Sequence, residues 1–289
     1  NETIVFHRAN DIWGMKTGEV QSALDEKLRQ KNGKIRKNGK ICIGPAGEHL
    51  VLYSSIVSDE RVSGRGGTGA VMGWMRLKAV CVSGNKDVPI HDQEKMVAHS
   101  KKWFKYLRNH PLTGEQLPKY GTAGLVSAMQ MRSILATKNY TYGRYNDFEK
   151  ISGEELAEKY NIVNKGCLSC PIRCSRTVDV DGKAVKGPEL ETLVLLGSGI
   201  VNNDLPSILK WNYELDELGM DTISCANTIS FAMEANEKGV WKNGLCFSKT
   251  EELSKIFEDI AYRRGIGDEL AQGSKRLSEK YGGKEFAIH

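Results

Sequence analysis

The sequence of 289 residues lacks any apolar run that approaches the roughly 18 residues needed to cross a bilayer. No charged and then apolar leader opens it, and it has no internal repeat or low-complexity stretch. Hydrophobic residues make up 40% and charged residues 27%, which is typical of a globular protein with one large or two moderate domains. We therefore expect a cytoplasmic protein without a membrane span.

Charge of one sign is not in strong excess, since the net charge is only +5. The basic residues are not interleaved with aromatic ones, so we expect no nucleic-acid partner. Much of the positive charge is local and indicates either a solvated helix face and loop or a docking patch for an acidic partner. The residues of this basic segment are Lys27, Arg29, Lys31, Lys34, Arg36, Lys37 and Lys40.

The seven cysteines do not form an even disulfide framework, which fits a reducing compartment. Three of them, Cys167, Cys170 and Cys174, form a C-x2-C-x3-C triplet. Thiolates this close in sequence can bind one soft metal centre, but zinc and a cubane iron–sulfur cluster both need a fourth ligand from elsewhere. Histidine is sparse nearby, which weakens a zinc site with three cysteines and one histidine. A zinc knuckle and three separate buried thiols remain alternatives.

The pattern of apolar residues divides the chain near Pro89. Residues 1–89 predict one helix, which carries Val20 and Leu28 on one face, and β-like runs at residues 41–43, 50–56 and 77–82. Residues 90–289 show helical periodicity instead. We therefore predict an α+β fold that is mostly α, with an all-α second domain. The expected helix stripes are Met96, Trp103 and Leu107; Leu205, Ile208, Leu209, Leu215 and Leu218; Ile223, Ala226, Ile229 and Met233; and Leu253, Ile256, Phe257 and Ile260.

A glycine-rich run covers residues 64–73 and matches G-x-G-x-x-G, with Asp87 about twenty residues on. A dinucleotide-binding turn is disfavoured, because the following helices are not interleaved with strands. The glycines can instead let the backbone approach an anionic ligand, with Arg61 and Arg65 as phosphate partners. A tight packing turn is the alternative.

Residues 216–221 (DELGMD) predict a tight corner between two helices. Gly219 stands where the first helix should end in a left-handed cap, and Asp221 stands as N-cap of the next. Capping alone explains this pattern. A functional interpretation adds that two carboxylates and backbone groups at one corner suit a donor-rich heterocycle such as a pterin.

Together these segments resemble the aldehyde ferredoxin oxidoreductase family, tungsten or sometimes molybdenum enzymes that carry a bis-pterin cofactor beside a [4Fe-4S] cluster. The resemblance runs essentially from end to end. It implies that residues 1–89 are the C-terminal part of a β-rich domain that cradles the cofactor and that residues 90–289 form the helical domain. The segments that carry it are residues 43–48 (IGPAGE), 64–73 with 77–79, 117–122 (LPKYGT), the cysteine triplet, 187–191 (GPELE) and 216–221.

The resemblance also implies roles for individual residues. The cysteine triplet supplies three cluster ligands, and one pterin loop of the form D-x-x-G-L-[CD] has methionine in place of leucine. Arg61 and Val62 lie against the pterin near its phosphates, where Mg²⁺ can bridge them. Glu191 approaches the metal as a candidate proton-transfer group, a role that suits a buried carboxylate. The pterin-loop residues are Asp216, Gly219, Met220 and Asp221.

The implied function is oxidation of a small aldehyde to a carboxylic acid, with electrons passed through the cluster to ferredoxin or a similar carrier. A benzoyl-CoA-reductase-type catalytic subunit of the same family, an electron-transfer module with a cluster but no pterin, and a zinc-stabilised helical protein are alternatives. A homodimer or a separate electron-transfer subunit is the expected assembly.

The departures from the family pattern matter as much. The chain starts in what resembles the middle of the family's first domain and stops before its last third, so the second pterin loop and the fourth cluster cysteine are missing. We expect a fragment that is inactive alone. Where some relatives place a Glu-x-x-His pair for a metal that bridges two subunits, this chain has residues 210–213 (KWNY). A bridging iron is therefore not expected.

Overall fold

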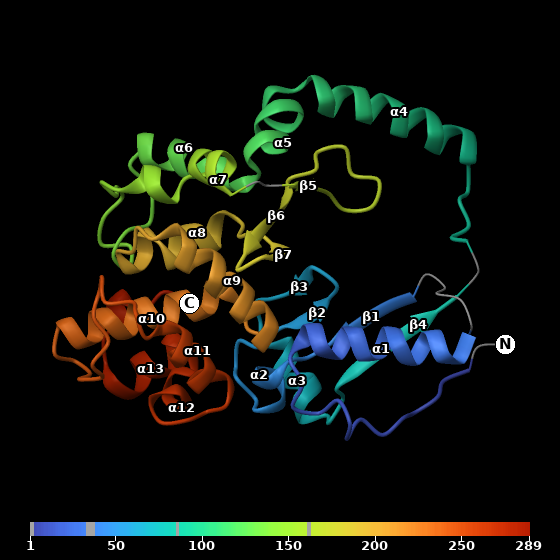
Figure 1. Cartoon of the computed structure of the whole chain (residues 1–289). Helices are drawn as coiled ribbons and strands as arrows, with labels where there is room; N and C mark the ends of the chain where they lie inside the picture. The colour runs from blue at the N-terminus through green and yellow to red at the C-terminus, as the bar shows by residue number, and fades with distance from the viewer. Residues whose placement is uncertain (1–2, 33–37, 85–86, 161–162) are drawn as a thin grey trace.

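The computed structural model describes residues 3–32, 38–84, 87–160 and 163–289. Figure 1 shows a four-stranded sheet with helix α1 beside it on one side of the molecule, and the helices α8 to α13 packed together on the other. The predicted fold class, α+β and mostly α, is confirmed. In the described ranges no helix is long and apolar enough to cross a membrane.

The first part of the chain is built on antiparallel strands in the order β3-β2-β1-β4. Helix α1 buries Val20 against Cys42 of β1 and Val57 of β2. An antiparallel sheet has no parallel crossover to hold a dinucleotide, so the dinucleotide-binding interpretation of the glycine run is wrong. The elements are α1 Thr17–Asn32, β1 Asn38–Cys42, α2 Pro45–Glu48, β2 Ile56–Ser58, β3 Arg61–Ser63, α3 Thr68–Trp74 and β4 Ala79–Ser83.

The predicted strand over residues 50–56 is mostly wrong, because β2 begins only at Ile56. Val51 and Tyr53 precede it outside any strand, and both are buried in the core of the helical part. The run is apolar because it crosses between the two parts of the molecule, not because it is a strand.

The helical part surrounds one large core, and three of the four predicted stripes face it. Ile208 and Leu215 of α9, Ile229 of α10 and Phe257 of α11 are all fully buried. The elements are α4 Gln93–Asn109, η1 Pro111–Gln116, α5 Leu117–Tyr120, η2 Thr122–Gly124, α6 Leu125–Met131, η3 Phe148–Ile151, α7 Gly153–Lys159, β5 Val163–Lys165, β6 Ser175–Val180, β7 Lys183–Lys186, α8 Leu190–Leu196, η4 Ser198–Ile200, α9 Leu205–Leu218, α10 Thr222–Glu237, α11 Leu253–Ala261, α12 Ile266–Leu270, α13 Gly273–Tyr281 and η5 Lys284–Phe286.

The prediction of an all-α second part is wrong, because β5, β6 and β7 form a three-stranded antiparallel sheet. Asp181 and Gly182 connect β6 to β7, both with positive φ of 53° and 78°. An Asp-Gly pair between two short runs is a strong hairpin signal, so the sequence did contain evidence for this sheet. The sheet matters here because β5 and β6 carry the cysteine loop between them.

Helix α4 forms where its periodicity predicts, but none of its residues is buried. Met96 is 51% and Trp103 56% exposed. Figure 1 shows α4 at the top of the molecule, apart from the helices around the core. The apolar stripe correctly predicts a helix and wrongly predicts a place in this core.

Part of the basic segment is engaged in ion pairs within the chain. Lys27 contacts Asp11 and Lys40 contacts Asp25, each at 2.5 Å. The side chains of Arg29, Lys31, Lys34, Arg36 and Lys37 lie outside the described residues. The docking of an acidic partner on this basic segment therefore stays a prediction.

Candidate functional site

The three clustered cysteines lie on one loop between β5 and β6. Lys165 pairs with Ser175 across the two strands, so the ends of the loop are held together. The backbone N–H of Cys170 donates to the carbonyl of Cys167 at 3.0 Å, which forms a turn. All three thiols are free, Cys167 exposed and the other two partly exposed. No three histidine, cysteine or carboxylate side chains of the described residues converge at metal-ligand distances. The loop thus places three donors together in the chain, and their ligand role stays a prediction.

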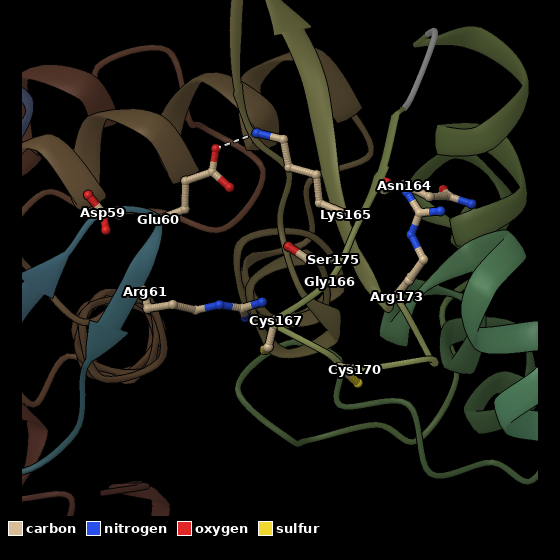
Figure 2. A pocket seen from close by; sticks show the side chains of 10 residues that line it. All are labelled: Asp59, Glu60, Arg61, Asn164, Lys165, Gly166, Cys167, Cys170, Arg173 and Ser175. Carbon is tan, nitrogen blue, oxygen red and sulfur yellow. Dashed lines mark hydrogen bonds and ion pairs between the residues drawn. The ribbon is translucent and has the colours of Figure 1, made fainter. Parts of the chain in front are cut away.

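A cavity of about 560 Å³ separates this loop from the turn between β2 and β3. Figure 2 shows the side chain of Arg61 extending from β3 toward Cys167. Glu60 forms an ion pair with Lys165 at 2.6 Å, which joins the turn to β5. Burial raises the pKa of Cys174, and the charge of Arg61 opposes this rise. Arg61 therefore supplies positive charge where thiolates would be needed.

The predicted helix corner is confirmed. Helix α9 ends at Leu218, and Gly219 follows in the left-handed region at φ 75° and ψ 43°. A Cβ atom on Gly219 would lie 2.8 Å from the backbone nitrogen of Gly44, so both conformation and space require glycine. Asp221 caps α10 by accepting from the Ser224 N–H at 2.8 Å.

Asp216, at the start of the corner, is only partly exposed to water. Burial raises its pKa to about 6, the charges of Glu217 and Asp221 add to this, and Lys186 opposes it. Hydrogen bonds donated by a ligand would stabilise the charged form of this carboxyl group. The corner therefore has unused capacity for a donor-rich ligand.

Strand β3 connects the cysteine cavity with the corner. Arg61 at its start lines the cavity, and Gly64 directly after its end faces the corner. A Cβ atom on Gly64 would lie 2.7 Å from Oδ1 of Asp221, and Nε of Arg65 lies 4.0 Å from Oδ2 of the same residue. Val62 between them pairs with Val57 of β2. One short strand thus spans from the thiols to the capping carboxylate.

Three other glycines of the 64–73 run serve packing. A Cβ atom on Gly67, Gly69 or Gly73 would lie 2.6 Å or less from a backbone oxygen of a neighbouring segment. The packing-turn alternative is therefore confirmed for these three positions. The anion-binding alternative remains only for the end of the run nearest Arg65.

Glu191 lies in the first turn of α8 and is exposed in this chain, so the burial that would suit a proton-transfer role is not found here. Its two neighbours fix its position. The N–H of Leu190 donates to the hydroxyl of Thr122 at 3.0 Å, and the hydroxyl of Thr192 lies 2.8 Å from that of Thr222. Thr222 begins α10 directly after Asp221, so Glu191 is held next to the corner.

Two buried serines lie at the corner, and no sequence pattern indicated them. Ser54 pairs with Met220 in an isolated β-bridge, and the N–H of Ser55 donates to the carbonyl of Gly219 at 2.8 Å. Both serines are fully buried, and neither hydroxyl has a hydrogen-bond partner. Buried polar groups without partners are rare, so these hydroxyls fit a ligand with polar edges. They lie in a run that the sequence pattern assigned to a strand, which hid them.

Two protein-family models match this chain. Residues 1–84 match the family model of the aldehyde ferredoxin oxidoreductase N-terminal domain, and residues 98–289 match that of aldehyde ferredoxin oxidoreductase domains 2 and 3. The chain belongs to the aldehyde ferredoxin oxidoreductase family. Its members are oxidoreductases, so the enzyme class expected from the sequence is confirmed.

Individual relatives of the chain belong to the same aldehyde ferredoxin oxidoreductase family. The chain is 41% identical to the tungsten-containing aldehyde ferredoxin oxidoreductase of Pyrococcus furiosus and 39% identical to that of Thermococcus kodakarensis, in each case over 100% of this chain and 48% of the relative. The active-site complex BamBC of benzoyl coenzyme A reductase with 1,5-dienoyl-CoA superimposes with a TM-score of 0.79 at 25% identity, covering 97% of this chain and 45% of that one. The chain spans about half the length of the curated relatives it matches.

Proposed function

We propose that the full-length protein oxidises an aldehyde to a carboxylic acid at a tungsten bis-pterin centre and passes the electrons through a [4Fe-4S] cluster to ferredoxin or a similar carrier. The observation that carries the proposal is the path of β3. This strand begins at a cavity lined by Cys167 and Cys170 and ends against Asp221. A redox cofactor at the corner would therefore lie within one short strand of the cysteine loop, a length of about 10 Å.

The residues at the corner suit a pterin. Asp216 and Asp221 offer acceptors to ring N–H groups and the exocyclic amine, and the hydroxyls of Ser54 and Ser55 offer donors to ring carbonyls. Arg61 and Arg65 offer positive charge to the pterin phosphates. Mg²⁺ would add positive charge to these phosphates near the backbone of Val62. The three thiols fit a cubane cluster whose fourth ligand comes from outside this chain.

Oxidation of an aldehyde with water to a carboxylic acid releases two electrons and two protons. When bound, a tungsten centre would supply two-electron redox chemistry, and a cluster held by the three cysteines would supply one-electron transfer. The part that this chain adds is proton handling. Glu191 has the position for it, because Thr122 and Thr222 hold both of its neighbours beside the corner.

The test of this role is Glu191→Gln in the full-length protein purified without air. The variant should keep the tungsten and iron contents of the wild type and lose most of its aldehyde-dependent reduction of ferredoxin. Glu154→Gln is the matched control, because Glu154 lies on α7, away from α8, and its carboxylate accepts a hydrogen bond from the hydroxyl of Ser127. Unchanged turnover in Glu191→Gln would remove Glu191 from the mechanism.

The superposition with benzoyl coenzyme A reductase supports a second candidate, a catalytic subunit that acts on an aromatic acyl-CoA. The higher identity to the tungsten-containing aldehyde ferredoxin oxidoreductases favours the aldehyde. Parallel assays for aldehyde oxidation and for reduction of benzoyl-CoA separate the two. Tungsten in the purified protein would exclude the third candidate, an electron-transfer module without pterin. We also propose that the full-length protein is cytoplasmic.

A further inference from the structure

Arg176 is a buried cation beside the cysteine loop. It is the second residue of β6, two positions after Cys174, and is only 3% exposed. Its guanidinium donates to the carbonyls of Leu117 at 2.8 Å and Ser175 at 3.1 Å. All of its acceptors are neutral backbone groups, and its Nε is buried with no partner.

Arg176 has no ion pair within 4.0 Å among the residues that the structure describes. Burial lowers the pKa of Arg176, and the nearby Cys174 and Glu189 side chains oppose this only in part. Glu189 is itself bound by the hydroxyl of Thr122 at 2.7 Å. Burying a cation is unfavourable unless an anion compensates it, and the positive charge of Arg176 is compensated only in part.

Residues 117–122 form a slot around the side chain of Arg176. Gly121 has a positive φ of 65°, and a Cβ atom there would lie 3.1 Å from Cζ of Arg176 and 2.7 Å from the carbonyl oxygen of Cys174. Leu117 at the other end of the same segment accepts from the guanidinium, and Pro118 accepts from Asn164 of β5 at 2.6 Å. Residues 117–122, which the sequence singled out without a role, thus hold Arg176 and both strands of the cysteine loop.

We propose that Arg176 is the fixed counter-charge of the iron–sulfur cluster that Cys167, Cys170 and Cys174 would bind, and that it raises the reduction potential of this cluster. The inference rests on the proposed function. A cubane cluster with thiolate ligands is an anion that gains one more negative charge on reduction, so a buried cation stabilises the reduced form more than the oxidised form. If Arg176 only linked backbone carbonyls by hydrogen bonds, its charge would not be needed, since a neutral amide side chain also donates to carbonyls.

The matched control lies on the same loop. Arg173 carries the same charge three positions earlier, but it is exposed and donates to the carbonyl of Asn164. Water and salt screen an exposed charge far more than a buried one. Arg176→Gln and Arg173→Gln therefore remove the same charge from similar places in the chain with different screening.

The experiment is a redox titration of the cluster, followed by electron paramagnetic resonance, in the full-length protein purified without air. Arg176→Gln should lower the midpoint potential, so that the ratio of reduced to oxidised cluster at a fixed potential falls about threefold or more. The shift should persist at high salt. Arg173→Gln should give a smaller shift that disappears at high salt. Arg176→Lys should keep a midpoint close to that of the wild type.

An unchanged midpoint in Arg176→Gln, or a shift no larger than that of Arg173→Gln, would overturn the inference. If Arg176→Gln holds no cluster, the comparison passes to Arg176→Lys: a cluster retained there supports the need for the charge, and a cluster lost there as well assigns Arg176 a structural role and overturns it. A wild-type protein without any cluster signal would instead contradict the proposed function itself.

Discussion

The hydroxyl oxygens of Thr192 and Thr222 lie 2.8 Å apart and join the first turn of α8 to the first turn of α10. Thr192 is buried, so a valine there would leave Thr222 without this partner. We expect Thr192→Val to lower the free energy of unfolding by about 1 kcal/mol, measured by chemical denaturation of the purified protein. Thr222→Val and the double variant complete a cycle, and single-variant losses that simply add would show that the two hydroxyls do not interact.

Asp216 predicts a pH dependence of stability with a definite sign. Its pKa is about 6 in the folded protein against an ordinary value of 3.8, so the folded state binds the proton more tightly than the unfolded chain. The protonated Asp216 carboxyl group therefore contributes stability to the folded state below about pH 4, and this contribution is lost as the pH rises through 6. Asp216→Asn should therefore reduce the loss of stability between pH 4 and pH 7 by on the order of 1–2 kcal/mol. Asp181→Asn, at an exposed turn, is the control, and the same pH profile in both variants would show that Asp216 is not the group.

Lys78 and Glu48 form an ion pair with both side chains almost fully buried. Lys78 also donates to the carbonyl of Met15, and Glu48 accepts from the N–H of Gly14. Lys78→Met leaves the carboxylate buried without its cation and should cost about 3–5 kcal/mol of unfolding free energy. The control Lys159→Met breaks an exposed pair with Glu155 and should cost less than about 1 kcal/mol. Equal losses in the two variants would contradict the difference in burial.

Gly121 should not tolerate a side chain. Its backbone conformation, φ 65° and ψ −160°, is open almost only to glycine, and the contacts with Cys174 and Arg176 add to the cost of a side chain. Gly239 also has a positive φ, of 70°, but no atom lies within 4 Å of the new Cβ, so Gly239→Ala is a control without such contacts. We expect a lower thermal midpoint for Gly121→Ala than for Gly239→Ala. Identical midpoints would mean that the cysteine loop yields freely to the extra carbon.

The sequence predicted those features that local rules determine. Helix α9 and its corner follow from the spacing of Leu205 to Leu218, the left-handed cap at Gly219 and the capping side chain of Asp221. The grouping of the three cysteines on one loop also follows from their spacing. None of these features requires knowledge of distant parts of the chain.

Features that depend on distant contacts were missed or wrong. The guanidinium of Arg176 bonds to Leu117, 59 residues away, and nothing near either residue indicates this contact. Periodicity predicts helix α4 but cannot say whether another element covers Trp103. The exposure of Glu191 likewise depends on what surrounds α8, and a pattern of residue types does not contain that information.

The central claim is that the cysteine loop binds a [4Fe-4S] cluster beside a tungsten site, and metal analysis tests it most directly. Iron and tungsten are measured in the full-length protein purified without air, for the wild type and for a variant with Cys167, Cys170 and Cys174 all changed to serine, with Cys81→Ser as control because Cys81 is exposed and outside the loop. We predict about four iron atoms and one tungsten per chain in the wild type and the control, and loss of the iron in the triple variant. Iron retained in the triple variant, or a wild type without iron and tungsten, would contradict the account.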